Sequence, residues 1–119
     1  MLSLALLDAC LQDALSVLLK LGGYIILFSV LSNVITHIPR RRAESAAFFS
    51  CFLEITGGIP AVTAAFAYPQ SYVILLPFLA FGGLCSFMQT GSVIKDTPLS
   101  LRSYFFTKIL LALLIFLCE

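Results

Sequence analysis

The sequence predicts an all-α protein of polytopic membrane helices, two of which are interrupted by glycine pairs. Of its 119 residues, 61% are hydrophobic and 11% are charged, whereas soluble domains are about 45–50% apolar and about 25% charged. The mean hydropathy is +1.07. The apolar residues form long runs, and glycine pairs interrupt two of them. This length has room for about three or four membrane segments in a single domain, residues 1–119.

Composition also limits the function. The formal net charge is +1, which gives no reason to expect nucleic-acid binding. One histidine and four widely spaced cysteines predict neither a metal site nor a cofactor. Ser50 and Thr56 have no nearby base except Glu54, so we do not expect an enzyme.

Residues 2–20 read as an amphipathic helix. Their polar side chains fall within an arc of roughly 140° at helical spacing, and leucines cover the other side. We expect Gly22-Gly23 to loosen the chain between this helix and the next segment.

Residues 21–38 are predicted to form the first span, because they give about 27 Å of apolar helix. Pro39 and the Arg40–Arg42 cluster end it, and such a cluster marks the cytoplasmic side. Ser29, Ser32 and Asn33 form a polar stripe along this helix. The stripe predicts either hydrogen bonds to a neighbouring helix or the lining of a cavity.

Residues 43–68 carry the most informative feature, an acidic side chain at membrane depth. A charge there costs roughly 2.5–3.5 kcal/mol and usually faces a bundle interior or a wet cavity. We expect Gly57-Gly58-Ile59-Pro60, which follows Glu54, to interrupt the helix. The segment is therefore either a re-entrant hairpin with its tip near Glu54–Gly58 or a single kinked span.

Two further segments complete the chain. Residues 71–94 are long enough to cross a membrane, but Gly82-Gly83 at their centre predicts either a broken helix or a notch where a neighbouring helix packs. Residues 101–118 are the final span. Lys95 and Arg102 would join the arginine cluster on the cytoplasmic side if 43–68 crossed the membrane, so the positive-inside rule favours the kinked span.

Four stretches occur together in a familiar order and spacing. They are Leu21–Leu31 (LGGYIILFSVL), Phe52–Gly58 (FLEITGG), Phe81–Gln89 (FGGLCSFMQ) and Leu99–Phe105 (LSLRSYF). This pattern resembles the C-terminal half of the YlbJ-type sporulation integral membrane proteins, which belong to the gate, or nucleoside-recognition, group. The resemblance covers nearly the whole chain.

The resemblance implies a gate-like domain similar to one repeat of a concentrative nucleoside transporter, in a multi-pass protein of the bacterial cell membrane. It favours the hairpin over the kinked span. It also implies that Glu54 and Thr56 face a solute beside Ser86 and Gln89. The residues expected at the site are Glu54, Thr56, Gly57, Gly58, Gly82, Gly83, Ser86 and Gln89. Family chains carry two such repeats, so a second membrane half is expected, from a different partner or from a second copy.

Two functions follow. In the first, the chain is half of a small-solute or ion transporter, and Glu54 binds a polar group of the solute or a coupling cation. In the second, it is a non-transporting structural membrane subunit of spore or envelope assembly, and Glu54 bonds only to its neighbours, such as Ser50 or Thr56. Replacing Glu54 by glutamine distinguishes loss of binding from loss of assembly.

Overall fold

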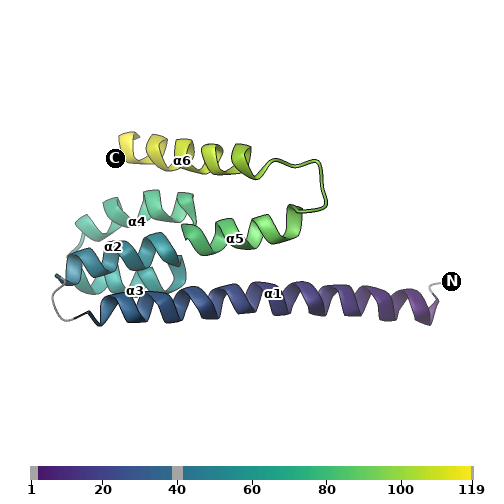
Figure 1. The fold of residues 1–119 in the computed structure, drawn as a ribbon. Helices are drawn as coiled ribbons and strands as arrows, with labels where there is room; N and C mark the ends of the chain where they lie inside the picture. Colours follow the sequence, from purple (N-terminus) through teal and green to yellow (C-terminus); the bar gives the residue numbers. More distant parts are fainter. Residues whose placement is uncertain (1–2, 39–41, 119) are drawn as a thin grey trace.

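The computed structural model describes residues 3–38 and 42–118, and all the regular elements in these ranges are helices (Figure 1). Residues 39–41, and with them two of the three clustered arginines, lie outside the described part. Three helical segments are long and apolar enough to cross a membrane: Leu4–Thr36, Gln70–Ile94 and Leu101–Cys118. Within the described residues, the structure is thus compatible with a multi-pass membrane protein.

The first helix, α1, is continuous over Leu4–Thr36. The predicted separation into an amphipathic helix, 2–20, and a span, 21–38, is therefore wrong. A glycine inside a helix costs only about 1 kcal/mol relative to alanine, and α1 continues through Gly22 and Gly23 although nothing lies within 4 Å of a Cβ atom at either position. At 1.5 Å per residue the helix is about 50 Å long. Figure 1 shows its N-terminal part extending past the other helices.

The next two helices, α2 (Ala43–Leu53) and α3 (Ile55–Ala65), are joined by the single residue Glu54 and pack tightly together. Segment 43–68 is thus a helical hairpin rather than one kinked helix. Its break lies at Glu54, within the predicted tip Glu54–Gly58, whereas the interruption expected at Gly57–Pro60 is absent. Those four residues lie within α3, which begins at Ile55 and contains Pro60 in its second turn.

Close contact between the two hairpin helices depends on Gly58. A Cβ atom at this position would lie 2.4 Å from the Cα atom of Cys51. The buried side chains of Ala47, Cys51 and Val62 fill the space between α2 and α3, together with Leu75 of the following helix. The small protein core thus lies within and beside the hairpin.

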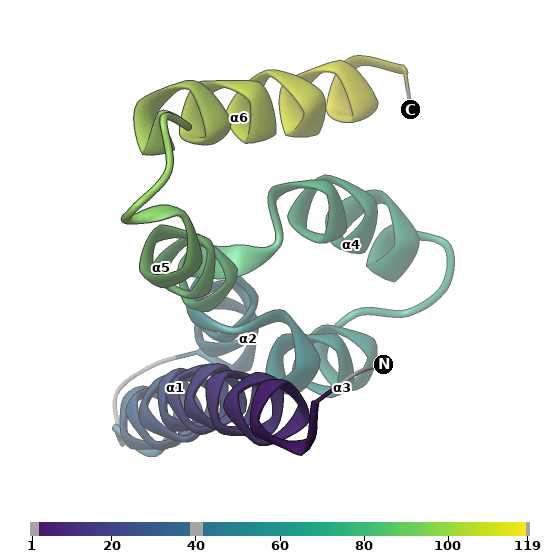
Figure 2. The ribbon, with the colours of Figure 1, turned by 90° about the vertical axis from the view of Figure 1, so that its right-hand side faces the viewer.

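The last three helices form two candidate membrane spans. Helix α4 (Gln70–Phe81) ends at Gly82, whose φ of 86° is left-handed, and α5 (Gly83–Ile94) continues from it. The break predicted from the glycine pair is present. Helix α6 (Leu101–Cys118) returns along α4 and α5. The view in Figure 2 shows α1 and α6 on opposite sides of the other helices.

Candidate functional site

The tip of the hairpin is a single extended residue. Glu54 has φ −151° and ψ 117°, and its N–H donates to the Ser50 carbonyl at 2.8 Å, which closes α2. The same residue is the N-cap of α3. One buried glutamate therefore ends one helix and begins the next.

The Glu54 carboxylate is held by donors from the start of α3. Its Oε1 accepts from the backbone N–H of Thr56 at 2.9 Å and from the Thr56 hydroxyl, and its Oε2 accepts from the backbone N–H of Gly57 at 2.7 Å. These amides are the unpaired donors of a helix N-terminus, where a negative charge is favoured. The side chain is 4% exposed. The hydrogen bonds offset the cost of burying this carboxylate.

A polar pocket of about 300 Å³ lies beside the tip, between α1 and the hairpin. Helix α1 contributes a row of polar side chains, α2 contributes a hydroxyl and the carboxylate, and α3 contributes small residues. The lining residues are Ser29, Ser32, Asn33, Thr36, Ser50, Glu54, Gly57 and Ala61. Oxygen atoms of hydroxyl, amide and carboxylate groups therefore converge on one space.

The predicted polar stripe of α1 has both of its alternative roles. The hydroxyls of Ser32 and Ser50 are 2.6 Å apart and buried, which ties α1 to α2 by a hydrogen bond. Ser29 and Asn33 of the same stripe line the pocket. One stripe thus provides a helix–helix bond and a cavity wall.

The expected site residues near the tip have different positions. Glu54 and Gly57 line the pocket, and Thr56 is bonded to the Glu54 carboxylate. Gly58 is buried against Cys51, so it serves packing rather than binding.

The backbone of the broken helix packs closely against the hairpin tip at Gly83. A Cβ atom at Gly83 would lie 3.3 Å from the Leu53 carbonyl oxygen and 3.5 Å from the Glu54 nitrogen. Gly82 supplies the left-handed turn that ends α4. The pair therefore positions the tip and contributes no wall to the polar pocket.

Ser86 and Gln89 do not line this pocket. The Gln89 side-chain amide donates to the Cys85 sulfur at 3.3 Å, and Gln89 lines a separate hollow with Leu21 of α1. The Ser86 hydroxyl is near Gly82 and within reach of Tyr104 on α6. The resemblance implies that both residues lie beside the solute with Glu54, but neither lines the pocket that Glu54 lines.

Several pocket residues were absent from the expected site. The sequence predicts a polar stripe of Ser29, Ser32 and Asn33 but does not assign it to the site. It does not mark Thr36 or Ser50 as pocket residues. Thr36 continues the stripe at helical spacing and could have been found that way. Among residues 3–38 and 42–118, no group of three His, Cys, Asp or Glu side chains is placed to hold a metal ion.

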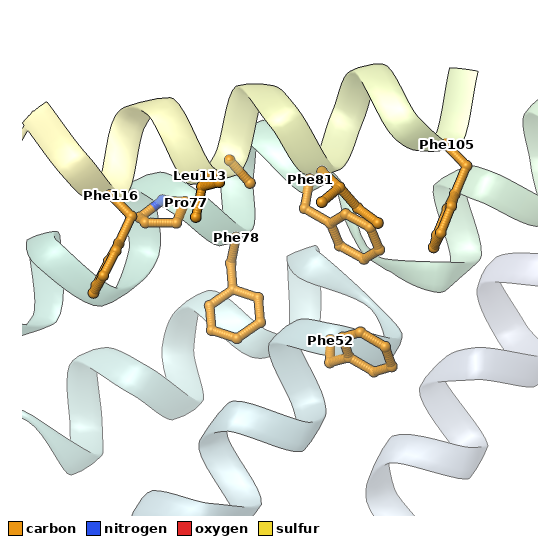
Figure 3. Close-up of a pocket in the computed structure, with 9 residues that line it drawn as sticks. Phe52, Pro77, Phe78, Phe81, Phe105, Leu113 and Phe116 are labelled. Carbon is orange, nitrogen blue, oxygen red and sulfur yellow. The ribbon is translucent and has the colours of Figure 1, made fainter. Parts of the chain in front are cut away.

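A second, larger hollow has a different character. It encloses about 370 Å³ between α4 and α6, and phenylalanine rings dominate its wall (Figure 3). All its lining side chains are apolar, from Phe52 at the hairpin to Phe116 near the C-terminus. It offers a polar solute no hydrogen bond.

Comparison of the chain with protein-family models, curated proteins and solved structures finds no significant match. The site is therefore interpreted through its own geometry.

Proposed function

We propose that the chain is a gate-type membrane subunit, half of a small-solute or ion transporter, whose binding site is the polar pocket beside Glu54. One observation carries the proposal: a carboxylate and the polar side chains of two further elements converge on one pocket in a protein that is otherwise strongly apolar. Polar groups at membrane depth usually mark a solute or ion pathway.

The chemistry of the wall selects the class of ligand. Three donors hold the Glu54 carboxylate in place, and its remaining lone pairs can accept from a hydroxyl or amine or coordinate a cation. The hydroxyls of Ser29 and Thr36 and the amide of Asn33 add further partners. A small polar solute, such as a nucleoside, or a cation matches these groups.

A second membrane half completes this proposal. Thr56, Gly57 and Asn33 are exposed at the edge of the pocket. A hetero-partner or a second copy covering this side would enclose the ligand. The resemblance to sporulation membrane proteins supports a place in the bacterial cell membrane.

Binding is tested by ligand-dependent thermal stabilisation of the purified protein in detergent. The probes are sodium chloride against choline chloride, followed by a panel of nucleosides. Asn33→Ala removes a pocket side chain that takes no part in the Glu54 hydrogen bonds, so it should abolish stabilisation and leave the unliganded melting temperature unchanged. Gln89→Ala is the matched control, because Gln89 lines a different hollow. Equal responses of the two variants would refute the pocket as the binding site.

Re-entry of the hairpin is tested by cysteine labelling with a membrane-impermeant reagent. Single cysteines replace Arg42, Gln70 and Lys95 in a background without the exposed Cys10 and Cys118. Figure 1 shows both ends of the hairpin at the C-terminal end of α1. We expect positions 42 and 70 to react from one side and position 95 from the other. Reaction of position 70 from the side of position 95 would make the segment a span.

A structural subunit of spore or envelope assembly is the second candidate. It is favoured by the hydrogen bonds of Glu54, which satisfy the carboxylate within the hairpin without any solute. This function predicts that Glu54→Gln impairs assembly, whereas Asn33→Ala has no effect on any ligand response. Asn33→Ala thus separates the two functions, since Glu54→Gln disturbs the hairpin hydrogen bonds in either case.

A further inference from the structure

Another hollow, of about 300 Å³, lies between the end of α5 and the start of α6, far along the chain from the hairpin tip. Hydroxyl-bearing side chains dominate its wall, with two aliphatic residues among them. The lining residues are Thr90, Ile94, Leu99, Ser100, Ser103, Tyr104 and Thr107. No acidic side chain is among these.

Two of the hydroxyls are free to donate. Thr90 and Thr107 donate to backbone carbonyls of their own helices, at 2.9 and 2.8 Å. The Ser100 oxygen accepts from the Ser103 N–H at 3.4 Å, which leaves its proton available, and the Ser103 hydroxyl has no helix carbonyl as acceptor. Ser100 and Ser103 therefore offer donors to a ligand in the hollow.

A positive charge lies next to one lining residue of the hollow. The Lys108 ammonium is 5.7 Å from the centre of the Tyr104 ring, which itself lines the hollow. Lys108 is inside α6, a candidate membrane span, about 10 Å from its start at 1.5 Å per residue. A lysine at such depth extends toward the membrane surface, and side chains of a helix incline toward its N-terminus. Its charge is thus directed to the end of α6 that carries the hollow.

The surroundings of the hollow favour an anion. Lys95 and Arg102 flank the connection between α5 and α6, and Asp96 is the acidic residue within it. Residues 95–100 are exposed and join two candidate spans, so they belong at the level of the lipid headgroups. Figure 1 shows this connection at the end of the bundle away from the two ends of the hairpin.

We propose that this hollow binds the phosphate of an anionic phospholipid. The Lys108 ammonium supplies the charge, Ser100 and Ser103 donate hydrogen bonds to phosphate oxygens, and Ile94 and Leu99 contact the apolar part of the lipid. A net negative headgroup, such as phosphatidylglycerol, is preferred over phosphatidylcholine, because a choline group would bring a further cation next to Lys95 and Arg102.

The proposal is tested by native mass spectrometry of the full chain released from detergent with phosphatidylglycerol or phosphatidylcholine. A basic residue near an anionic surface contributes about 1 kcal/mol, so Lys108→Gln should lower phosphatidylglycerol binding about fivefold. Lys108→Arg should retain it. Lys20→Gln is the matched control, since Lys20 is an exposed lysine of α1, outside the α5–α6 connection, and should bind as the parent does. Ser103→Ala, which raises helix propensity, should weaken binding without loss of helix content.

Three results would overturn the proposal. The first is an equal loss in Lys108→Gln and Lys20→Gln, which would indicate general attraction to the surface. The second is equal binding of the two lipids. The third is displacement of the lipid by millimolar inorganic phosphate, which would make the hollow a site for the free anion. Each measurement is accompanied by the far-ultraviolet circular dichroism spectrum, and Lys108→Arg keeps the test decisive if Lys108→Gln does not fold.

Discussion

Replacing Gly58 by alanine should open the hairpin. A Cβ atom there would lie 2.4, 2.5 and 2.6 Å from the Cα, Sγ and N atoms of Cys51. Because ordinary carbon contacts are about 3.5–4.0 Å, α2 and α3 must separate by about 1 Å to admit the methyl group. Two of the three atoms belong to the backbone and cannot rotate away. Overpacking of this kind costs about 1–3 kcal/mol, whereas alanine for glycine in an unobstructed helix gains about 1 kcal/mol.

Gly23→Ala is the matched control, since nothing lies within 4 Å of its Cβ position in α1. We expect the two variants to differ by about 2 kcal/mol in the free energy of hairpin opening. The assay is alkylation of Cys51, which is 0% exposed, with the other three cysteines replaced by alanine. When reaction requires opening, 2 kcal/mol corresponds to a rate about thirtyfold faster in Gly58→Ala. Equal alkylation rates in the two variants would show that α2 and α3 do not pack through Gly58.

Three further outcomes follow from the same contacts. Glu54→Gln should accelerate alkylation of Cys51. The Gly57 N–H donates to Oε2 of Glu54, and the NH₂ group of glutamine in that position cannot accept this hydrogen bond. An unpaired buried donor costs about 1–3 kcal/mol, which favours opening of the hairpin. In a double-mutant cycle by SDS unfolding, Ser32→Ala and Ser50→Ala should couple by about 0.6 kcal/mol; additive effects would contradict the hydrogen bond. Gly82→Ala should lower thermal stability by about 1–2 kcal/mol, and Gly82→Asn by less, because φ is 86°; equal losses would argue against a left-handed residue.

The positions of the helices could be predicted largely from apolar runs, but their ends could not. Gly22-Gly23 and Gly57-Gly58 both appeared to be breaks, and both lie inside helices. Glycine weakens a helix by only about 1 kcal/mol. Packing against Cys51 compensates this cost at Gly58, whereas nothing lies within 4 Å of a Cβ atom at Gly22 or Gly23 and the long α1 helix tolerates them. Gly82-Gly83 is a true break, because Gly82 adopts the left-handed conformation that ends α4. The sequence does not distinguish these cases, since each is a glycine pair inside an apolar run.

The site illustrates the same limit. Glu54 could be singled out from its polarity in an apolar run, and it does line the polar pocket. Its capping of α3 was not predicted, because Ser, Thr, Asp and Asn are the usual residues at that position. The partner of the α1 stripe could not be found either. Ser50 is 18 residues from Ser32, and nothing in their spacing indicates that two helices meet there.

The two interruptions of helical structure belong together. Carbonyls at the end of a helix are unpaired, and in a membrane such groups must be buried in protein or line a wet cavity. Gly83 covers this end of α2, since a Cβ atom at Gly83 would lie 3.4 Å from the Cys51 oxygen and 3.3 Å from the Leu53 oxygen. A side chain at Gly83 would press on these oxygens and would also have to adopt the left-handed φ of 78°. The Glu54 tip and the Gly82-Gly83 break are therefore one structural unit: each motif would expose backbone polar groups if the other did not lie against it.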